Sequence, residues 1–421
     1  MSDFLRLYSL CNRPTLPVSR SPQLVYFLTD MLPGLGLADI RAPLNLVLAL
    51  DRSAAMAGEP LRELKQAVIW LLEQLHPDDV ISVVVFGKQA RTVIPAQEVG
   101  SRKQLPEGEL YRRWSAGVRG VGKQRLSSGL AEALNQASRW HRPDRVSRII
   151  LVVGGRSDDS LQAVHKAANQ AGAQGIPIVC IGLGNEWDEE LLIELSDRSV
   201  QAPPGTRSGM VYYVGDIKEI RQTFDRVYRS VQICLQDTCM NIRPARGVQI
   251  RQVWQTRPVL RDIGSGAIRP DRVAIQVGEM GIDGASFLLE ALLEPRQAGA
   301  VRIAQEEVSF CVPGEGKQLE QNELVVEFSK NLAVTSRLEG YVMDVVQKAQ
   351  SLQLQSQALI DADAGEIGSA IQKLRQVVPV LMSQGEILLA DRMRKEVDYL
   401  FRSGHITAEG RKLIRLAFRE R

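Results

Sequence analysis

Two oxygen-bearing side chains, Asp51 and Ser53, follow the apolar run Leu44–Leu50 and precede a helical pattern that begins near Pro60. An apolar run of this length with a helix behind it predicts a buried parallel strand. Open α/β sheets bind their ligands at the carboxyl ends of the strands, so this loop is the first candidate for chemistry. In the same place, both oxygens could instead satisfy exposed backbone N–H groups, which is a structural role.

A second candidate is the basic segment from Ser101 to Arg148, where eleven Lys and Arg residues oppose four acids and give a local charge of +7. We expect several of its cations to gather with two neighbours at the rim of the Asp51 loop; the rim residues are Arg52, Arg119, Lys123, Arg125 and Arg156. One interpretation is a solvated face. The other is a binding site for an anionic partner, either an acidic protein surface or nucleic acid. Aromatic residues are sparse in the segment, which weighs against single-stranded nucleic acid.

Catalytic motifs are missing from the sequence. The chain has no dinucleotide fingerprint in context and no phosphate-loop motif, and none of its four histidines stands near a Ser or Cys of a nucleophile motif. We therefore expect neither enzymatic activity nor a cofactor.

Bulk properties limit the class of protein. A chain of 421 residues suggests two or three domains, and 44% hydrophobic with 24% charged residues is ordinary for a globular protein. No uncharged apolar run reaches about 18 residues, and the first residues do not resemble a secretory leader, so no membrane association is expected. The five cysteines are scattered and odd in number, which predicts a reducing cytoplasm.

Residues 43–234 alternate between strand and helix patterns, which predicts a doubly wound, mostly parallel α/β sheet. The expected strands are Leu44–Asp51, Val80–Phe86, Thr92–Pro95, Arg148–Val153, Pro177–Leu183 and Val211–Val214. The expected helices are Pro60–His76, Ser127–Trp140, Asp158–Ala173, Asp188–Ser199 and Ile217–Ile233. This domain would place Asp51 at the end of its first strand.

The flanking parts have other patterns. Residues 235–330 lose helical periodicity and show short β-like runs between turns, which predicts an antiparallel β-sandwich. Within residues 1–42, the strand-like piece Leu24–Asp30 cannot form a stable sheet alone, so we expect it to pair with the sandwich. Residues 331–421 are helical, with breaks that predict a bundle of three or four helices.

Several stretches resemble a von Willebrand factor A (VWA) domain across residues 43–234. They are Leu44–Gly58, Leu75–Phe86, Ser127–Leu134, Arg148–Arg156 and Ile181–Leu192. The domain order, with a sandwich and a helical tail, is similar to that of a group of bacterial cytoplasmic proteins. This resemblance implies a Rossmann-like fold and a role as a protein–protein interaction subunit or adaptor. It also implies partners such as MoxR-type AAA+ ATPases or Ser/Thr kinase and phosphatase signalling modules.

The resemblance further implies a metal-ion-dependent adhesion site, in which Asp-x-Ser-x-Ser, a Thr and a second Asp hold Mg²⁺. Asp51 and Ser53 match this set, whereas Ala55 replaces the second Ser, Gln124 the Thr and Gly154 the second Asp. Mg²⁺ needs near-octahedral oxygen ligands, and the loss of one carboxylate also removes half of the negative charge. We therefore expect a degenerate site without metal.

Two alternatives remain open. The chain could be a nucleic-acid-associated subunit that binds through the basic rim at residues 102–156. It could also be a Mg²⁺-dependent adhesion domain in which Gln124 and water replace the lost ligands.

Overall fold

The structure is a computed structural model that describes residues 3–37, 40–100, 124–200 and 209–416. The chain divides into two compact units. One is the central segment Ile40–Ile233, and the other combines Met1–Asp39 with Cys234–Arg421. We describe each unit by itself.

The central unit is built on one six-stranded sheet with the strand order β6-β5-β4-β7-β8-β9. Its strands are β4 (Leu44–Asp51), β5 (Val80–Phe86), β6 (Ala90–Glu98), β7 (Val146–Val153), β8 (Ile178–Leu183) and β9 (Met210–Val214). Strand β4 pairs in parallel with both β5 and β7, and only β6 runs antiparallel to its neighbour. All eight residues of β4 are buried, as expected for a central strand covered on both faces.

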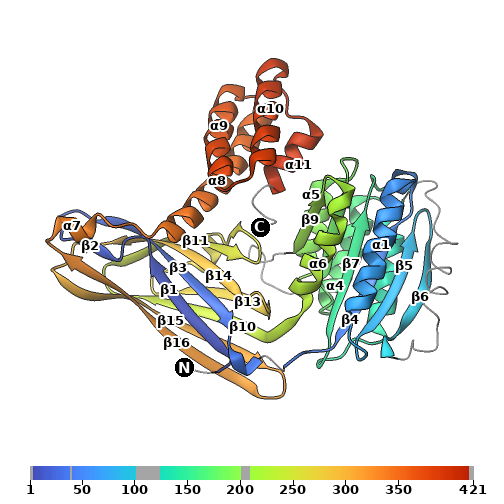
Figure 1. Ribbon diagram of the computed structural model, residues 1–421, viewed down its shortest axis with the longest axis horizontal. Coiled ribbons are helices and arrows are strands. Elements are labelled where there is room, and N and C mark those ends of the chain that lie inside the picture. Colours follow the sequence, from blue (N-terminus) through green and yellow to red (C-terminus); the bar gives the residue numbers. More distant parts are fainter. Residues whose placement is uncertain (1–2, 38–39, 101–123, 201–208, 417–421) are drawn as a thin grey trace. The chain divides into compact units, whose positions relative to one another are not determined.

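Helices cover both faces of this sheet (Figure 1). Helices α1 (Glu59–Gln74) and α6 (Ile220–Val231) contact each other, while α3 (Leu126–Ser138) contacts α4 (Leu161–Ala173), which contacts α5 (Glu189–Arg198). Among the described residues of this unit, short 3-10 turns precede two of the helices: η2 (Ala54–Met56) before α1 and η4 (Ile217–Glu219) before α6; η1 (Leu35–Leu37) belongs to the other unit. The predicted fold class is confirmed for this unit.

The two faces of β4 have different neighbours. Leu46, Leu48 and Leu50 belong to the apolar core that includes α1 and α6. On the opposite face, Asn45 donates a hydrogen bond from Nδ2 to the Ala137 carbonyl of α3 at 2.8 Å. Because side chains alternate along a strand, Asp51 projects to the same side as Asn45.

The second unit contains two sheets with the orders β1-β3-β14-β11-β12 and β13-β10-β15-β16-β2. The first sheet consists of β1 (Leu5–Cys11), β3 (Gln23–Pro33), β11 (Val248–Arg257), β12 (Arg261–Asp262) and β14 (Ala285–Leu293). The second consists of β2 (Thr15–Pro17), β10 (Ile233–Pro244), β13 (Val273–Gly281), β15 (Gly299–Val312) and β16 (Gly316–Ser329), and η5 (Ser265–Ala267) precedes β13. Strand β3 pairs antiparallel with β14, so a strand from before the VWA segment lies in a sheet with strands from after it.

The chain ends in helices α7 (Leu332–Thr335), α8 (Gly340–Asp363), α9 (Ile367–Ser383), α10 (Ile387–Ser403) and α11 (Ala408–Leu416). One apolar cluster joins Val342 and Val346 of α8 to Tyr26, Leu28 and Trp254 of the first sheet. This cluster fixes the helical part against the outer face of that sheet.

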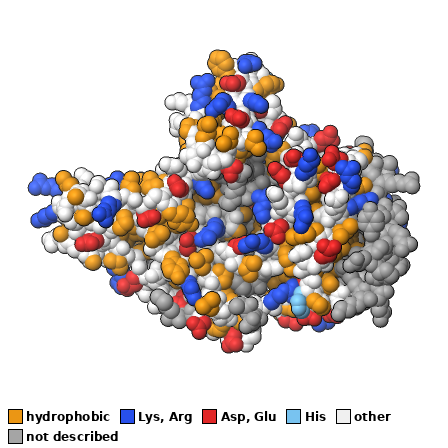
Figure 2. All heavy atoms as spheres, in the orientation of Figure 1, with side chains coloured by type: hydrophobic (Ala, Val, Ile, Leu, Met, Phe, Trp, Pro, Cys, Tyr) orange, Lys and Arg blue, Asp and Glu red, His pale blue; other side chains and the backbone are white. Residues whose placement is uncertain are grey.

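The surface carries mixed charge on the face seen in Figure 2, where Lys and Arg side chains are interspersed with Asp and Glu over the visible helices of each unit. Among the described residues, no helix is long and apolar enough to cross a bilayer.

Candidate functional site

Asp51 is fully buried at the carboxyl end of β4, and both of its carboxylate oxygens accept hydrogen bonds from the protein. Oδ1 accepts from the Ser53 N–H at 2.6 Å, and Oδ2 accepts from the Ser53 hydroxyl and the Gly154 N–H, each at 3.0 Å. Burial raises the pKa of Asp51, although the N–H groups of Ser53 and Gly154 oppose that shift. The carboxylate therefore satisfies the local backbone.

Ser53 lies at the start of the η2 turn that follows Asp51. Its backbone carbonyl accepts a hydrogen bond from the Met56 N–H at 3.0 Å, which closes η2. Its hydroxyl donates to Asp51 and does not cap the turn. We predicted that the oxygens of both Asp51 and Ser53 would satisfy backbone N–H groups; the side chain of Asp51 does so, whereas that of Ser53 does not.

Gly154 follows β7, the parallel neighbour of β4, so it lies directly beside Asp51. A Cβ atom at Gly154 would come within 2.3 Å of the Met56 Sδ and 3.7 Å of the Asp51 Oδ2. Met56 is fully buried, so its thioether fills the space that a side chain at position 154 would need. The resemblance to VWA domains implies a carboxylate at this position, and the structure places the Met56 thioether in that space.

Ala55 and Gln124 complete the set of departures. The Ala55 Cβ would lie 3.1 Å from a Cβ at Gly155, so the η2 turn packs closely against the segment after β7. Gln124 is buried, and its Nε2 donates to the Gly155 carbonyl. Its Oε1 is buried and has no hydrogen-bond partner within the described part of the chain. This amide oxygen is thus an acceptor without a donor among the described residues, whereas the Ser53 hydroxyl is engaged as a donor to Asp51.

These side chains are a poor fit for Mg²⁺. They supply one carboxylate that already holds three donors, one hydroxyl and one neutral amide oxygen, while Ala55 and Gly154 supply no side-chain oxygen. Mg²⁺ dehydrates reluctantly and usually needs one or two carboxylates in octahedral geometry. Within the described ranges, no group of three His, Cys, Asp or Glu residues could hold a metal ion.

Asp159 forms hydrogen bonds with residues next to the site. It accepts hydrogen bonds from the Ser127 N–H at 2.8 Å, from the Ser127 hydroxyl at 2.6 Å and from the Ser157 hydroxyl at 3.1 Å. The sequence predicted a helix over Asp158–Ala173, but α4 begins at Leu161 and Ser160 caps it, so Asp159 precedes the helix. Asp159 instead anchors the first turn of α3, which comes earlier in the chain.

Three of the five predicted rim cations lie on segments at this edge. Arg52 directly follows Asp51. The backbones of Gln124 and Ser157 pair with each other, which brings their neighbours Arg125 and Arg156 to the same edge. Arg125 and Arg156 are exposed, and Arg52 is half-buried. Arg119 and Lys123 lie outside the described residues.

Sequence reasoning missed a hollow on the other side of Gly154. Its volume is about 460 Å³, and its lining comes from η2, α1 and the ends of β7, β8 and β9. The lining residues are Ala55, Met56, Pro60, Gly154, Leu183, Gly184, Asn185, Glu186, Gly215, Asp216 and Ile217. Glu186 and Asp216 are exposed, so this side of the edge is acidic. The residues that follow β8 and β9 could have been found from the rule that ligands bind at the carboxyl ends of strands.

Comparison with known proteins identifies the class. Residues 45–226 match the von Willebrand factor type A domain, and residues 340–421 match the Sll0103-like C-terminal alpha-helical domain. The chain is therefore a VWA-domain protein with an Sll0103-like helical domain at its C-terminal end.

Protein sll0103 from Synechocystis is 26% identical over 289 residues, which cover 66% of this chain and 64% of that relative. The matched segment thus spans less than two thirds of the relative. A VWA protein from Catenulispora acidiphila has a TM-score of 0.71 at 15% identity, with 100% of this chain and 97% of that chain covered. The ArnB paralog VWA2 from Sulfolobus acidocaldarius has a TM-score of 0.54 at 13% identity, with 99% and 98% covered. Both structures share the fold.

Proposed function

We propose that the chain is a non-enzymatic protein–protein interaction subunit of a bacterial assembly, and that it binds its partner at the carboxyl edge of the VWA sheet without a metal ion. The observation that carries this proposal is the closed state of Asp51. Its two oxygens are engaged by Ser53 and Gly154, and Met56 fills the place of the missing second carboxylate. A VWA domain makes a role in protein interaction plausible.

Charge supports the choice of a protein partner. The edge presents cations on one side of the site, at Arg125 and Arg156, and acids on the other, at Glu186 and Asp216. A surface with both signs orients a protein whose own charges are complementary, and it repels partners with the wrong pattern. A nucleic acid would meet the acidic side with its phosphates, which disfavours binding across the whole edge.

The proposed absence of catalysis rests on the site chemistry. A general base needs to lie within hydrogen-bond reach of the proton that it removes. Asp51 does contact the Ser53 hydroxyl, but both groups are buried. His141, by contrast, forms a hydrogen bond with Ser147, and His165 lies beside Glu194; both pairs belong to other parts of the domain.

The proposal also includes the class of protein that binds at this edge. We favour a protein that acts with VWA-domain proteins in bacteria, such as a MoxR-type AAA+ ATPase or a Ser/Thr kinase or phosphatase. A cytoplasmic location is part of this proposal.

Affinity capture tests the proposal when it is combined with a blocked edge. The full chain would be used as bait in lysate of its host, with and without EDTA, and captured proteins would be tested again after purification. Ala54 is exposed on η2, so Ala54→Arg should abolish capture of a specific partner. The matched control is Ala173→Arg. Ala173 is an exposed alanine at the end of α4, near the amino ends of the strands and away from the carboxyl edge.

Capture that survives EDTA and nuclease but fails with Ala54→Arg supports the proposal. Capture that EDTA abolishes and Mg²⁺ restores would contradict metal independence. Binding of duplex or single-stranded nucleic acid that weakens steeply with salt and is lost in Arg125→Glu would favour the nucleic-acid alternative.

A further inference from the structure

Strand β11 of the second unit leaves part of its backbone without a neighbouring strand. One side of β11 pairs with β14 from Val248 to Arg257. On the other side, β12 pairs only with Trp254 and Gln255, and the Val253 carbonyl accepts from Ile263 at 2.9 Å. Among the strands that the structure describes, none pairs with this side of Val248–Gln252, although the Val248 N–H donates to the Ala245 carbonyl at 3.1 Å. Unpaired N–H and C=O groups on such an edge form a template for another strand.

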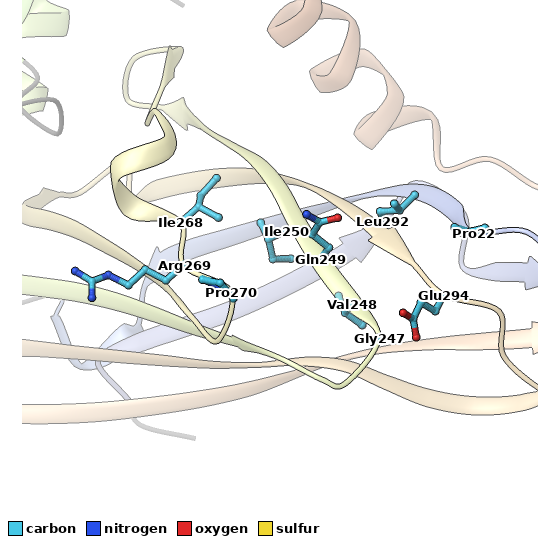
Figure 3. A pocket seen from close by; sticks show the side chains of 10 residues that line it. All are labelled: Pro22, Gly247, Val248, Gln249, Ile250, Ile268, Arg269, Pro270, Leu292 and Glu294. Atoms are coloured by element: carbon cyan, nitrogen blue, oxygen red, sulfur yellow. The ribbon is translucent and has the colours of Figure 1, made fainter.

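A hollow of about 570 Å³ lies beside this edge. Figure 3 shows its lining side chains, with Val248, Gln249 and Ile250 on β11 and Ile268, Arg269 and Pro270 on the facing turn. Pro22, Gly247, Leu292 and Glu294 complete the lining. Residues of β11 and residues of the turn at Ile268–Pro270 therefore line the same space, which also extends over β14 at Leu292.

The lining suits an extended peptide. Side chains alternate along β11, with Val248 and Ile250 buried and Gln249 and Arg251 exposed. Leu292 of β14, which pairs with Gln249, is half-buried and offers an apolar contact next to the edge. A register shift between Ile250 and Gln252 bends the strand, so only a short ladder can form.

The charge around the edge favours an acidic occupant. Arg246, Arg251 and Arg269 are exposed near the hollow, whereas Glu294 is the one acid in its lining. Within the described part of the chain, Arg251 and Arg269 make no ion pair. Two copies of the chain that paired through this edge about a two-fold axis would bring these arginines together, which disfavours self-association.

We propose that this hollow, which we call the β11 groove, binds a short extended segment of a partner protein that carries acidic side chains, and that the segment adds to β11 as an edge strand. Main-chain hydrogen bonds to the outward-facing groups, the Val248 carbonyl and the Ile250 N–H and carbonyl, supply affinity in this mode, and the arginines select for acidic residues. The β11 groove is independent of the VWA edge, so either proposal can fail while the other stands.

The test uses the full chain and two labelled hexapeptides in fluorescence anisotropy. One is Thr-Val-Glu-Val-Glu-Thr, and the other replaces each Glu with Lys. We expect saturable binding of the Glu peptide and at least tenfold weaker binding of the Lys peptide. Amide hydrogen exchange at Ile250, whose N–H faces the outer side of β11, should slow when the Glu peptide is bound, since this N–H would join a ladder.

Charge-reversal variants test the same assignment. Arg251→Glu with Arg269→Glu should weaken binding of the Glu peptide at least tenfold, because the reversed charges would repel its carboxylates. Both side chains are exposed, so the fold should tolerate the change. The matched control is Arg6→Glu, at an exposed arginine on β1, the opposite edge strand of the same sheet, which should leave binding unchanged.

Three results would overturn the proposal. They are equal affinity for the two peptides, no binding at millimolar peptide, and binding that the double variant does not affect. A concentration-dependent dimer that the double variant dissolves would assign the edge to a second copy and would also overturn it.

Discussion

The carboxyl edge of the VWA sheet and the edge at β11 differ in what they leave unsatisfied. At the first, Asp51 already accepts from Ser53 and Gly154, and Met56 occupies the adjoining space. At the second, the outer side of Val248–Gln252 meets no strand among the described residues, and arginines stand beside it. The position that the resemblance implies for a metal ligand is thus occupied by the chain's own groups, while part of a sheet edge is left without a neighbouring strand.

The comparison distinguishes the metal site that the family resemblance implies from the hydrogen bonds that the structure contains. The resemblance to VWA domains implies metal-ligand positions at Asp51 and Ser53, whereas in this structure the two side chains hydrogen-bond to each other and to the local backbone. Substitution of a residue that makes such internal hydrogen bonds should lower the free energy of unfolding. An open edge should show the opposite behaviour, with substitutions that affect binding and leave stability almost unchanged.

The largest effect should come from Gly154→Asp. Its Cβ would come within 2.3 Å of the Met56 Sδ, and its carboxylate would enter a buried site beside Asp51. A buried and uncompensated charge destabilises by about 3–5 kcal/mol. Denaturant unfolding of the full chain, followed at the VWA transition, measures the loss. Ala55→Ser, an exposed position, is the control and should change the free energy of unfolding by less than about 0.5 kcal/mol. If Gly154→Asp is as stable as the wild type, the site is not closed.

A smaller effect is expected from Asp51→Ala. The N–H groups of Ser53 and Gly154 would lose their acceptor in a buried site, which costs about 1–3 kcal/mol for an unsatisfied group. Asp51→Asn keeps one acceptor oxygen and should lose less. The free energies of unfolding of the two variants decide the matter, since equal losses would mean that the hydrogen bonds contribute little.

The pH dependence of stability should change in Asp51→Asn. Because burial raises the pKa of Asp51 above its ordinary 3.8, the folded state retains the proton to higher pH than the unfolded state does. The contribution of Asp51 to stability is therefore full below 3.8 and is lost as pH rises through the folded pKa. The difference in unfolding free energy between wild type and Asp51→Asn should fall over this window. A difference that rises with pH would show that the hydrogen bonds outweigh burial.

The smallest effect on stability is expected at the β11 edge. Arg251→Glu with Arg269→Glu should change the free energy of unfolding by less than about 0.5 kcal/mol per site, because exposed side chains away from structural networks contribute little. Thermal unfolding beside the peptide-binding assay measures both properties on one sample. A large loss of stability would mean that these arginines maintain the sandwich, and the contrast between the two edges would fail.

Much of the fold could be predicted from the sequence where apolar patterns are continuous. Strands β4 and β5 begin and end at the predicted residues, since both are buried along their whole length. Strand β10 was missed, because a register shift between Gln236 and Cys239, with Asp237 at a positive φ of 49°, interrupts its alternation. The edge strand β1 was missed as well.

The candidate site was predictable in part. Parallel pairing of β4 with β7 brings Asp51 beside Gly154, and the sequence pattern already implied that. The position of Met56 was not predictable, because which side chain fills a space depends on packing in three dimensions. The same holds for Asp159, which bonds to Ser127 of an earlier helix. The β11 groove depends on which strands pair, and sequence alone does not give that order.

Titration of the full chain with Mg²⁺, followed by calorimetry and thermal unfolding, tests metal independence most directly. A single site at a Mg²⁺ concentration ten times its dissociation constant would raise the free energy of unfolding by about 1.4 kcal/mol. The positive control is the variant Ala55→Ser, Met56→Ala, Gln124→Thr and Gly154→Asp, which restores the missing oxygens and the space for them. We predict that millimolar Mg²⁺ gives saturable heat and a higher Tm for that variant and neither for the wild type. Saturable heat in the wild type that Asp51→Ala abolishes would contradict the central claim.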